Sequence, residues 1–293
     1  MVCNLCPRSC GVDRAIKPGF CGAGVLPQIA RAALHYWEEP EISGKNGSGA
    51  IFFSGCNLDC VFCQNHEINH TMVGREWDAE SLSDLMLHLQ QKGAHNINLV
   101  TPTPHVDTII PAVRLAREKG LLIPIVYNTN GYETIETLQV LRGTVDIYLP
   151  DLKYVTPLVS KKYSNAQNYF EFASKALQEM HTQCGELYTD ENGIAKRGMI
   201  VRHLVLPGSV DETRRVMQFL ADTLPKTVHI SLMGQYIPCH KADFVPLNRK
   251  LLKREYDRAI DFCLQLGFEN IRIQSLSSAE AEYVPLFDGS IEP

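Results

Sequence analysis

The sequence has no apolar segment near the length of about 20 residues that a membrane-spanning helix requires. Its first residues, Met1 to Asn4, lack the basic and then apolar pattern of a secretion signal. It also lacks a basic stripe, and its formal net charge is −5, so charge gives no reason to expect a nucleic-acid partner. We therefore expect a cytoplasmic protein without membrane or nucleic-acid partners.

The composition is that of a globular chain rich in cysteine. Hydrophobic residues make up 45% of the 293 positions, which is enough for the core of one large α/β domain or of two ordinary ones. A core of that size does not need the ten cysteines as staples. Without a secretion signal, so many cysteines indicate a reducing compartment and metal binding rather than disulfides.

Three cysteines, Cys56, Cys60 and Cys63, follow the apolar run 50–53 with gaps of three and two residues. A short apolar run closed by glycine is typical of a buried strand, so we expect the cysteines in the loop that leaves it. Thiolates are soft ligands that suit iron–sulfur clusters, zinc or copper. Three of them can hold three irons of a [4Fe–4S] cluster and leave the fourth open, whereas an ordinary electron-transfer cluster takes four. A structural zinc loop or three unliganded thiols is the alternative.

This spacing resembles that of the radical S-adenosylmethionine (SAM) enzymes. The resemblance implies that the open iron binds the amino and carboxylate groups of SAM. It also implies reductive cleavage of SAM to a 5'-deoxyadenosyl radical, which abstracts hydrogen from a substrate. Phe62 lies between the last two cysteines, where the family usually has an aromatic residue against the adenine.

Four further cysteines lie near the start of the chain with gaps of two, three and ten residues: Cys3, Cys6, Cys10 and Cys21. Proline and glycine interrupt this segment so often that no helix or strand of useful length is expected. Because such a segment cannot bury a core, four thiolates on a metal would stabilise it. Structural zinc and a second iron–sulfur cluster both fit, and the sequence does not choose between them. Reduced thiols without a metal are the alternative.

From residue 50 onward, short apolar runs alternate with segments of helical periodicity, which predicts parallel βα units. We expect strands at 50–53, 96–100, 122–127, 145–149, 199–206 and 228–233, with a last edge strand at 269–274. Asn192-Gly193 predicts a type I′ hairpin turn. The fold class is therefore α/β, and the pattern resembles the partial (β/α)6 TIM-type barrel of radical SAM enzymes. We assign 1–49 to a Cys-rich leader and connector, 50–274 to the barrel and 275–293 to a C-terminal tail.

Ligand groups in such barrels come from the loops at the carboxyl ends of the strands. After the second predicted strand, Thr101 and Thr103 stand where the family often has Gly-Gly-Glu-Pro, a segment that contacts the SAM amino group. After the third, Asn128-Thr129-Asn130-Gly131 is similar to the Asp-Thr-Asn-Gly of pyruvate formate-lyase activating enzymes. The resemblance assigns Thr101, Thr103, Asn128 and Thr129 to the SAM site, with Asn128 in place of their aspartate.

Two more segments carry charged groups toward the same edge. Asp151-Leu152-Lys153 matches the Asp-Leu-Lys of those enzymes, whose lysine meets the SAM carboxylate and whose acidic groups help to bind a monovalent cation. Arg202 lies in a stretch similar to their Arg-x-Val-Val-x-Pro-Gly, whose arginine contacts SAM. Both cations suit a carboxylate ligand. A surface ion pair between Asp151 and Lys153 is the alternative, and His203, on the opposite strand face, is expected to be a core histidine.

Together these motifs predict a radical SAM oxidoreductase similar to pyruvate formate-lyase activating enzymes, with a [4Fe–4S] cluster and SAM as cofactors. The resemblance implies activation of a glycyl-radical enzyme or a related protein or peptide modification, with an electron donor such as flavodoxin or ferredoxin. Radical chemistry on a small metabolite is one alternative, and a non-catalytic iron–sulfur or zinc protein is another. The motifs identify no catalytic side chain.

Overall fold

The protein is described by a computed structural model that covers residues 2–278 and 285–291. Residues 279–284 and 292–293 of the predicted C-terminal tail lie outside the described residues. The described strands form one ten-stranded sheet in the order β10-β9-β8-β6-β5-β4-β2-β1-β3, with β7 paired to β8. The strands are β1 (Gln28–His35), β2 (Ser48–Phe53), β3 (Arg75–Glu76), β4 (Ile97–Val100), β5 (Ile125–Thr129), β6 (Ile147–Pro150), β7 (Tyr188–Thr189), β8 (Ala195–Leu204), β9 (His229–Met233) and β10 (Asn270–Ile273).

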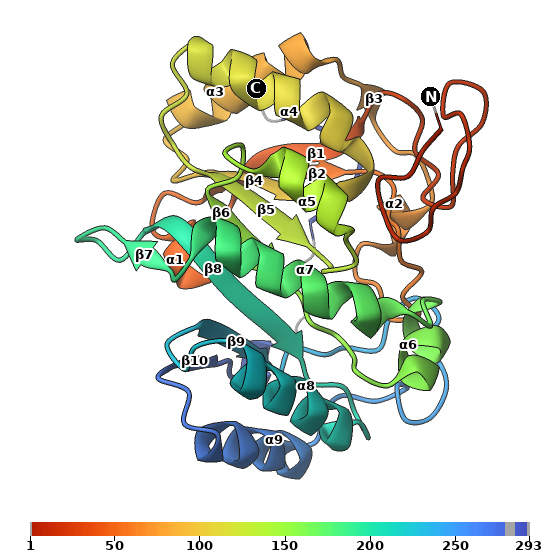
Figure 1. Ribbon diagram of the computed structural model, residues 1–293, viewed down its shortest axis with the longest axis vertical. Coiled ribbons are helices and arrows are strands. Elements are labelled where there is room, and N and C mark those ends of the chain that lie inside the picture. The colour runs from red at the N-terminus through yellow and green to blue at the C-terminus, as the bar shows by residue number, and fades with distance from the viewer. Residues whose placement is uncertain (1, 279–284, 292–293) are drawn as a thin grey trace.

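The longer helices cover one side of this curved sheet (Figure 1). The α-helices are α1 (Pro40–Ser43), α2 (His66–Asn69), α3 (Ala79–Gln91), α4 (Val106–Glu118), α5 (Ile135–Leu141), α6 (Pro157–Ser164), α7 (Tyr169–Cys184), α8 (Val210–Thr223) and α9 (Lys253–Gln265), and two short 3-10 turns are η1 (Thr103–His105) and η2 (Leu276–Ser278). None of the helices in the described ranges combines the length and the apolar character needed to cross a bilayer.

The sheet has the open barrel arrangement that the alternating pattern predicts. Each neighbouring pair from β2 through β4, β5, β6, β8 and β9 to β10 is parallel, and β1 and β3 add antiparallel strands at the other edge. In the part of the chain that the structure describes, no pairing joins β10 to β3, so the sheet is not closed. The expected partial barrel of six βα units is confirmed, and β1 joins it from within the predicted connector.

Local sequence accounts for the element boundaries. In α3, the Asp78 carboxylate accepts a hydrogen bond from the Ser81 N–H and caps the helix, whose buried face carries Leu82, Leu85, Met86 and Leu89. β2, β4, β5 and β6 are buried along their whole length, as expected for parallel strands covered on both faces.

The strand predicted at 122–127 begins later than expected. Leu122 is 90% exposed, and the N–H groups of Leu122 and Ile123 donate to the Gln90 side chain rather than to a neighbouring strand. Pro124 has no N–H to donate to the sheet, so the ladder starts at Ile125. At its other end, β5 extends to Thr129, so Asn128 and Thr129 belong to the strand itself.

The predicted type I′ turn is wrong. Gly193 has a φ of 76°, but Asn192 is not among the residues with positive φ, and a type I′ turn requires positive φ at both. The Asp190 carboxylate accepts hydrogen bonds from the N–H groups of Asn192 and Ile194, while the Gly193 N–H donates to the Asp190 carbonyl. The hairpin between β7 and β8 thus turns through residues 190–194, with a left-handed glycine at Gly193.

The leader has the irregular structure that its proline and glycine content predicts. Across residues 2–27 the structure records one isolated β-bridge, between Val2 and Asp13, and no helix. Arg8 fastens the segment to the barrel, since its guanidinium donates to the carbonyls of Asn57 and Asn165 and stacks over the Phe20 ring at 3.8 Å. Figure 1 shows the leader (red) beside α2.

Candidate active site

A cleft of about 740 Å³ opens at the carboxyl ends of the parallel strands. Its wall includes all three cysteines of the loop after β2, together with residues from the ends of β4, β5, β6, β8 and β9. Clefts of this volume hold ligands of drug or cofactor size. The position matches the rule that α/β barrels bind ligands at the carboxyl ends of their strands.

The cysteine loop is held by contacts on several sides. Gly55 has a φ of +94° and lies so close to the leader that a Cβ would stand 2.9 Å from the Cys21 carbonyl oxygen. The Asn130 amide lies 3.4 Å from the Cys56 sulfur and 2.8 Å from the Asn57 side-chain oxygen. The Cys60 sulfur lies 3.0 Å from the Ser164 hydroxyl. These contacts fix the loop as a unit at the end of β2.

The donor set suits a metal cluster. Burial raises the pKa of Cys56 to about 12 and also raises the pKa of Cys60 and Cys63, so thiolates here require positive charge nearby. Within residues 2–278 and 285–291, no three cysteine, histidine or carboxylate side chains lie close enough together to bind a single metal ion. Three thiols are one ligand short of the four that a structural zinc ion takes, and they match the three irons that a [4Fe–4S] cluster has ligated when its fourth iron is open.

Arg202, on β8, is the centre of a network of charged side chains in the same cleft. Its guanidinium donates to Asp151 (2.9 Å), to Glu38 (3.1 Å) and to the side-chain oxygen of Asn128 (2.7 Å). The Lys153 ammonium donates to the other oxygen of Asp151 at 2.6 Å. Asp151 and Lys153 are only 16% and 18% exposed, so the alternative of a surface ion pair is wrong.

The network keeps its members charged. Burial alone would raise the pKa of Asp151, but the adjacent Arg202 and Lys153 cations outweigh burial and lower it below its ordinary value. Burial alone would lower the pKa of Lys153, but Asp151 and the nearby Cys60 raise it instead. Asp151 is therefore ionised and Lys153 protonated in the cleft at neutral pH.

Glu38 is the member that sequence reasoning missed. It lies just after β1, and its carboxylate accepts hydrogen bonds from the side-chain amides of Asn128 (2.9 Å) and Asn98 (3.3 Å). It thus places a carboxylate beside Asn128, where the resembling sequences have an aspartate. Its contact with Arg202 spans 164 residues, and no local pattern around Glu38 indicates it.

The structure separates the two predicted threonines after β4. Thr101 lines the cleft and has a φ of 60°, whereas Thr103 is 1% exposed and does not line it. The hydroxyls of Thr103 and Thr129 both donate to the buried Glu133 carboxylate, at 2.6 and 2.5 Å. Burial raises the pKa of Glu133 to about 7. Thr103 is therefore a support for Glu133 and not part of the cleft wall.

The far side of the cleft is apolar. Phe62 lines it and packs edge-on against Tyr236 with ring centroids 5.9 Å apart, next to Met233 and Ile237. His203 points away, with ring nitrogens 2.6 Å from the Leu152 carbonyl and 3.0 Å from the Thr213 hydroxyl, which confirms it as a core histidine. The cleft thus has a charged end and an aromatic end, both adjoining the three cysteines.

Comparison with known proteins supports the family reading of this site. The Radical SAM superfamily matches residues 50–220. The uncharacterized protein MJ0674 of Methanocaldococcus jannaschii is 30% identical over 280 residues, covering 92% of this chain and 76% of that protein.

Among solved structures, SuiB of Streptococcus suis bound to S-adenosylmethionine has a TM-score of 0.51 at 15% identity, covering 78% of this chain and 50% of SuiB. The structure of anSMEcpe with AdoMet and a Kp18Cys peptide has a TM-score of 0.51 at 13% identity, covering 75% of this chain and 61% of the other. This chain thus spans about half the length of SuiB. Since the family match covers more than half of the chain and includes the cysteine loop, this protein belongs to the radical SAM superfamily, whose chemistry rests on a [4Fe–4S] cluster and SAM.

Proposed function

We propose that Cys56, Cys60 and Cys63 hold a [4Fe–4S] cluster and that the adjoining cleft binds SAM. The observation that carries the proposal is the meeting of the three cysteines with a buried charged network and an aromatic wall in one cleft. An electron carrier needs a cluster but no ligand cleft of this kind. The non-catalytic alternative therefore leaves the network without a purpose.

The two ends of the cleft correspond to the two ends of SAM. Lys153 and Arg202 supply the cations for the SAM carboxylate, and Glu38 and Thr101 supply oxygen acceptors for its amino group. Phe62 supplies a ring for the adenine, and Asn128 and Thr129 complete the wall between them. When bound, the cluster supplies one electron for cleavage of the sulfonium C–S bond, and the protein's side chains orient SAM and exclude water.

We further propose a protein or peptide as the substrate, with activation of a glycyl-radical enzyme as the narrower form of this proposal. The cleft rim carries Tyr36 and Trp37, which are 49% and 64% exposed and offer apolar surface to a bulky partner. Two structures with the same fold, SuiB and anSMEcpe, are bound to the precursor peptide SuiA and to a Kp18Cys peptide. A one-electron donor such as flavodoxin or ferredoxin, in a reducing cytoplasm, suits this chemistry.

The first test is SAM cleavage under anaerobic conditions. The protein is loaded with iron and sulfide and reduced, SAM is added, and 5'-deoxyadenosine is measured for the wild type, Cys60→Ala and Cys263→Ala. Cys263 is a buried cysteine on α9, outside both cysteine groups, and serves as the matched control. We expect release by the wild type and Cys263→Ala, and none above background by Cys60→Ala.

The EPR spectrum of the reduced cluster tests SAM binding without turnover. SAM should change the spectrum of the wild type and of Cys263→Ala, because it binds the open iron. If the cluster is fully loaded and reduced and its EPR spectrum does not change when SAM is added, the proposal is overturned in favour of a non-catalytic iron–sulfur protein.

A further inference from the structure

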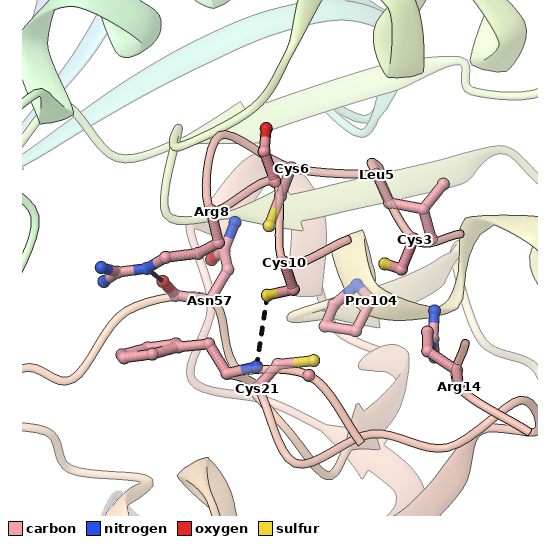
Figure 2. A pocket seen from close by; sticks show the side chains of 12 residues that line it. Cys3, Leu5, Cys6, Arg8, Cys10, Arg14, Cys21, Asn57 and Pro104 are labelled. Atoms are coloured by element: carbon pink, nitrogen blue, oxygen red, sulfur yellow. Dashed lines mark hydrogen bonds between the residues drawn. The ribbon is translucent and has the colours of Figure 1, made fainter. Parts of the chain in front are cut away.

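The four leader cysteines come together in one pocket although they are spread over 19 residues of irregular chain. Cys3, Cys6, Cys10 and Cys21 all line it, and Figure 2 shows their thiol groups directed into it. Gly19 allows the close approach, since a Cβ there would stand 3.2 Å from the Cys10 sulfur. The Phe20 N–H lies 3.3 Å from the same sulfur and donates to it. Four thiols and a backbone donor around one pocket are typical of a metal site.

Two kinds of metal centre suit four thiols, a single ion and an iron–sulfur cluster. In the described part of the chain, no group of three or more cysteine, histidine or carboxylate side chains is placed to hold a single metal ion, either at the leader or at Cys56, Cys60 and Cys63. A zinc ion draws four sulfurs to about 2.3 Å from one centre, whereas cysteines around an iron–sulfur cube each bind a different iron. The cavity between the leader thiols is only about 20 Å³, which would suit a single ion. We commit to the cluster because the leader pocket adjoins the barrel cysteines of a family built on a [4Fe–4S] cluster.

The pocket directly adjoins the barrel cysteine loop. Asn57 lines the leader pocket, and its carbonyl accepts a hydrogen bond from the Arg8 guanidinium at 2.8 Å. On the other side of Cys56, Gly55 lies against the Cys21 carbonyl. The leader therefore contacts the chain immediately before and immediately after one of the three barrel cysteines.

We infer that Cys3, Cys6, Cys10 and Cys21 ligate a second iron–sulfur cluster, which fixes the leader against both neighbours of Cys56. This inference rests on the proposed function in one respect: the barrel cysteines must hold a separate cluster. Four cysteines complete the ligands of a [4Fe–4S] cube, so this cluster has no open iron and no SAM site.

Three cysteine variants test the inference on the full chain. The first, Cys56→Ala/Cys60→Ala/Cys63→Ala, keeps only the leader group, and the second, Cys10→Ala/Cys21→Ala, keeps only the barrel group. Cys184→Ala/Cys263→Ala removes two buried cysteines outside both groups and is the control. After anaerobic loading with iron and sulfide, each is analysed for iron, acid-labile sulfide and zinc, and by EPR after reduction with and without SAM.

The wild type and the control should contain about eight irons per chain, and each of the other variants about four. SAM should leave the EPR signal of the first variant unchanged and alter that of the second. Zinc without labile sulfide in the first variant, or no metal at all, would overturn the inference. If the first variant fails to fold, the wild type decides the question. Its EPR spectrum after reduction must then contain two cluster signals, one of which does not change when SAM is added. A SAM-sensitive signal in the second variant supports the proposed function whatever the first one shows.

Discussion

The two cysteine groups of this protein present similar ligands on very different supports. Cys56, Cys60 and Cys63 follow β2, a strand buried along its length and hydrogen-bonded on both sides in the sheet. The leader cysteines lie on a chain whose described residues form one isolated β-bridge. The comparison teaches that a loop after a buried strand holds its cysteines by backbone packing, whereas the leader depends on side-chain contacts and, under the inference above, on its metal.

The largest effect that sharpens this comparison is expected from Arg202→Ala. The change leaves the carboxylates of Asp151 and Glu38 without their shared cation, which should destabilise the barrel by about 3–5 kcal/mol. It also removes a charge-assisted bond to the SAM carboxylate, so SAM affinity should fall about 10- to 100-fold. Anaerobic titration with SAM measures the affinity, and Lys196→Ala on the exposed hairpin is the control. An unchanged affinity would remove Arg202 from the SAM site.

A smaller effect is expected from Glu133→Gln. The pKa of Glu133 is raised to about 7 in the folded protein, so between its ordinary pKa of 4.5 and 7 the folded state binds more protons than the unfolded state. The free energy of unfolding should therefore fall as pH rises, by about 2 kcal/mol between pH 5.5 and 8. The change to glutamine should remove this slope.

Urea unfolding of the metal-loaded protein at the two pH values checks the Glu133 prediction. Glu136, exposed in the first turn of α5, supplies the matched control Glu136→Gln, which should keep the wild-type slope. Equal slopes in the wild type and Glu133→Gln would mean that Glu133 is ionised in the folded protein across this range.

The smallest expected effect concerns the leader and is tested by removing metal, without any change in sequence. If the metal fixes the leader, chelation should open it and speed trypsin cleavage after Arg14, a partly buried residue, by about tenfold. Cleavage after Lys92, exposed at the end of α3, should not change. Mass spectrometry of the fragments over time follows both sites. Equal acceleration at both would point to loosening of the barrel rather than of the leader.

Much of the barrel could be predicted from sequence because its signals are local. Apolar runs and helical periodicity gave the order of the strands and helices, and the spacing of Cys56, Cys60 and Cys63 indicated the family that the Radical SAM match confirms. Asp151 and Lys153 follow a predicted strand and Arg202 lies within another, and the structure brings all three into one cleft. The edge rule for parallel strands and the resemblance to the motifs of the activating enzymes were sufficient there.

The parts that sequence reasoning missed depend on contacts between distant segments. Glu38 reaches the cleft only because β1 pairs with β2 as an extra antiparallel strand. No periodicity in the sequence around Glu38 indicates this pairing. Thr103 turns to Glu133 instead of the cleft, since a buried carboxylate requires hydrogen-bond donors. At the hairpin, the Asp190 side chain decides the turn type against the dipeptide preference of Asn192-Gly193.

The bond between Arg8 and the Asn165 carbonyl has a consequence for biosynthesis. The leader leaves the ribosome long before Asn165 is made, by roughly ten to thirty seconds at ordinary rates of translation. During that interval its four thiols have no barrel to dock on. Docking of the leader is therefore completed only after α6 has been synthesised, which is late in the production of the chain.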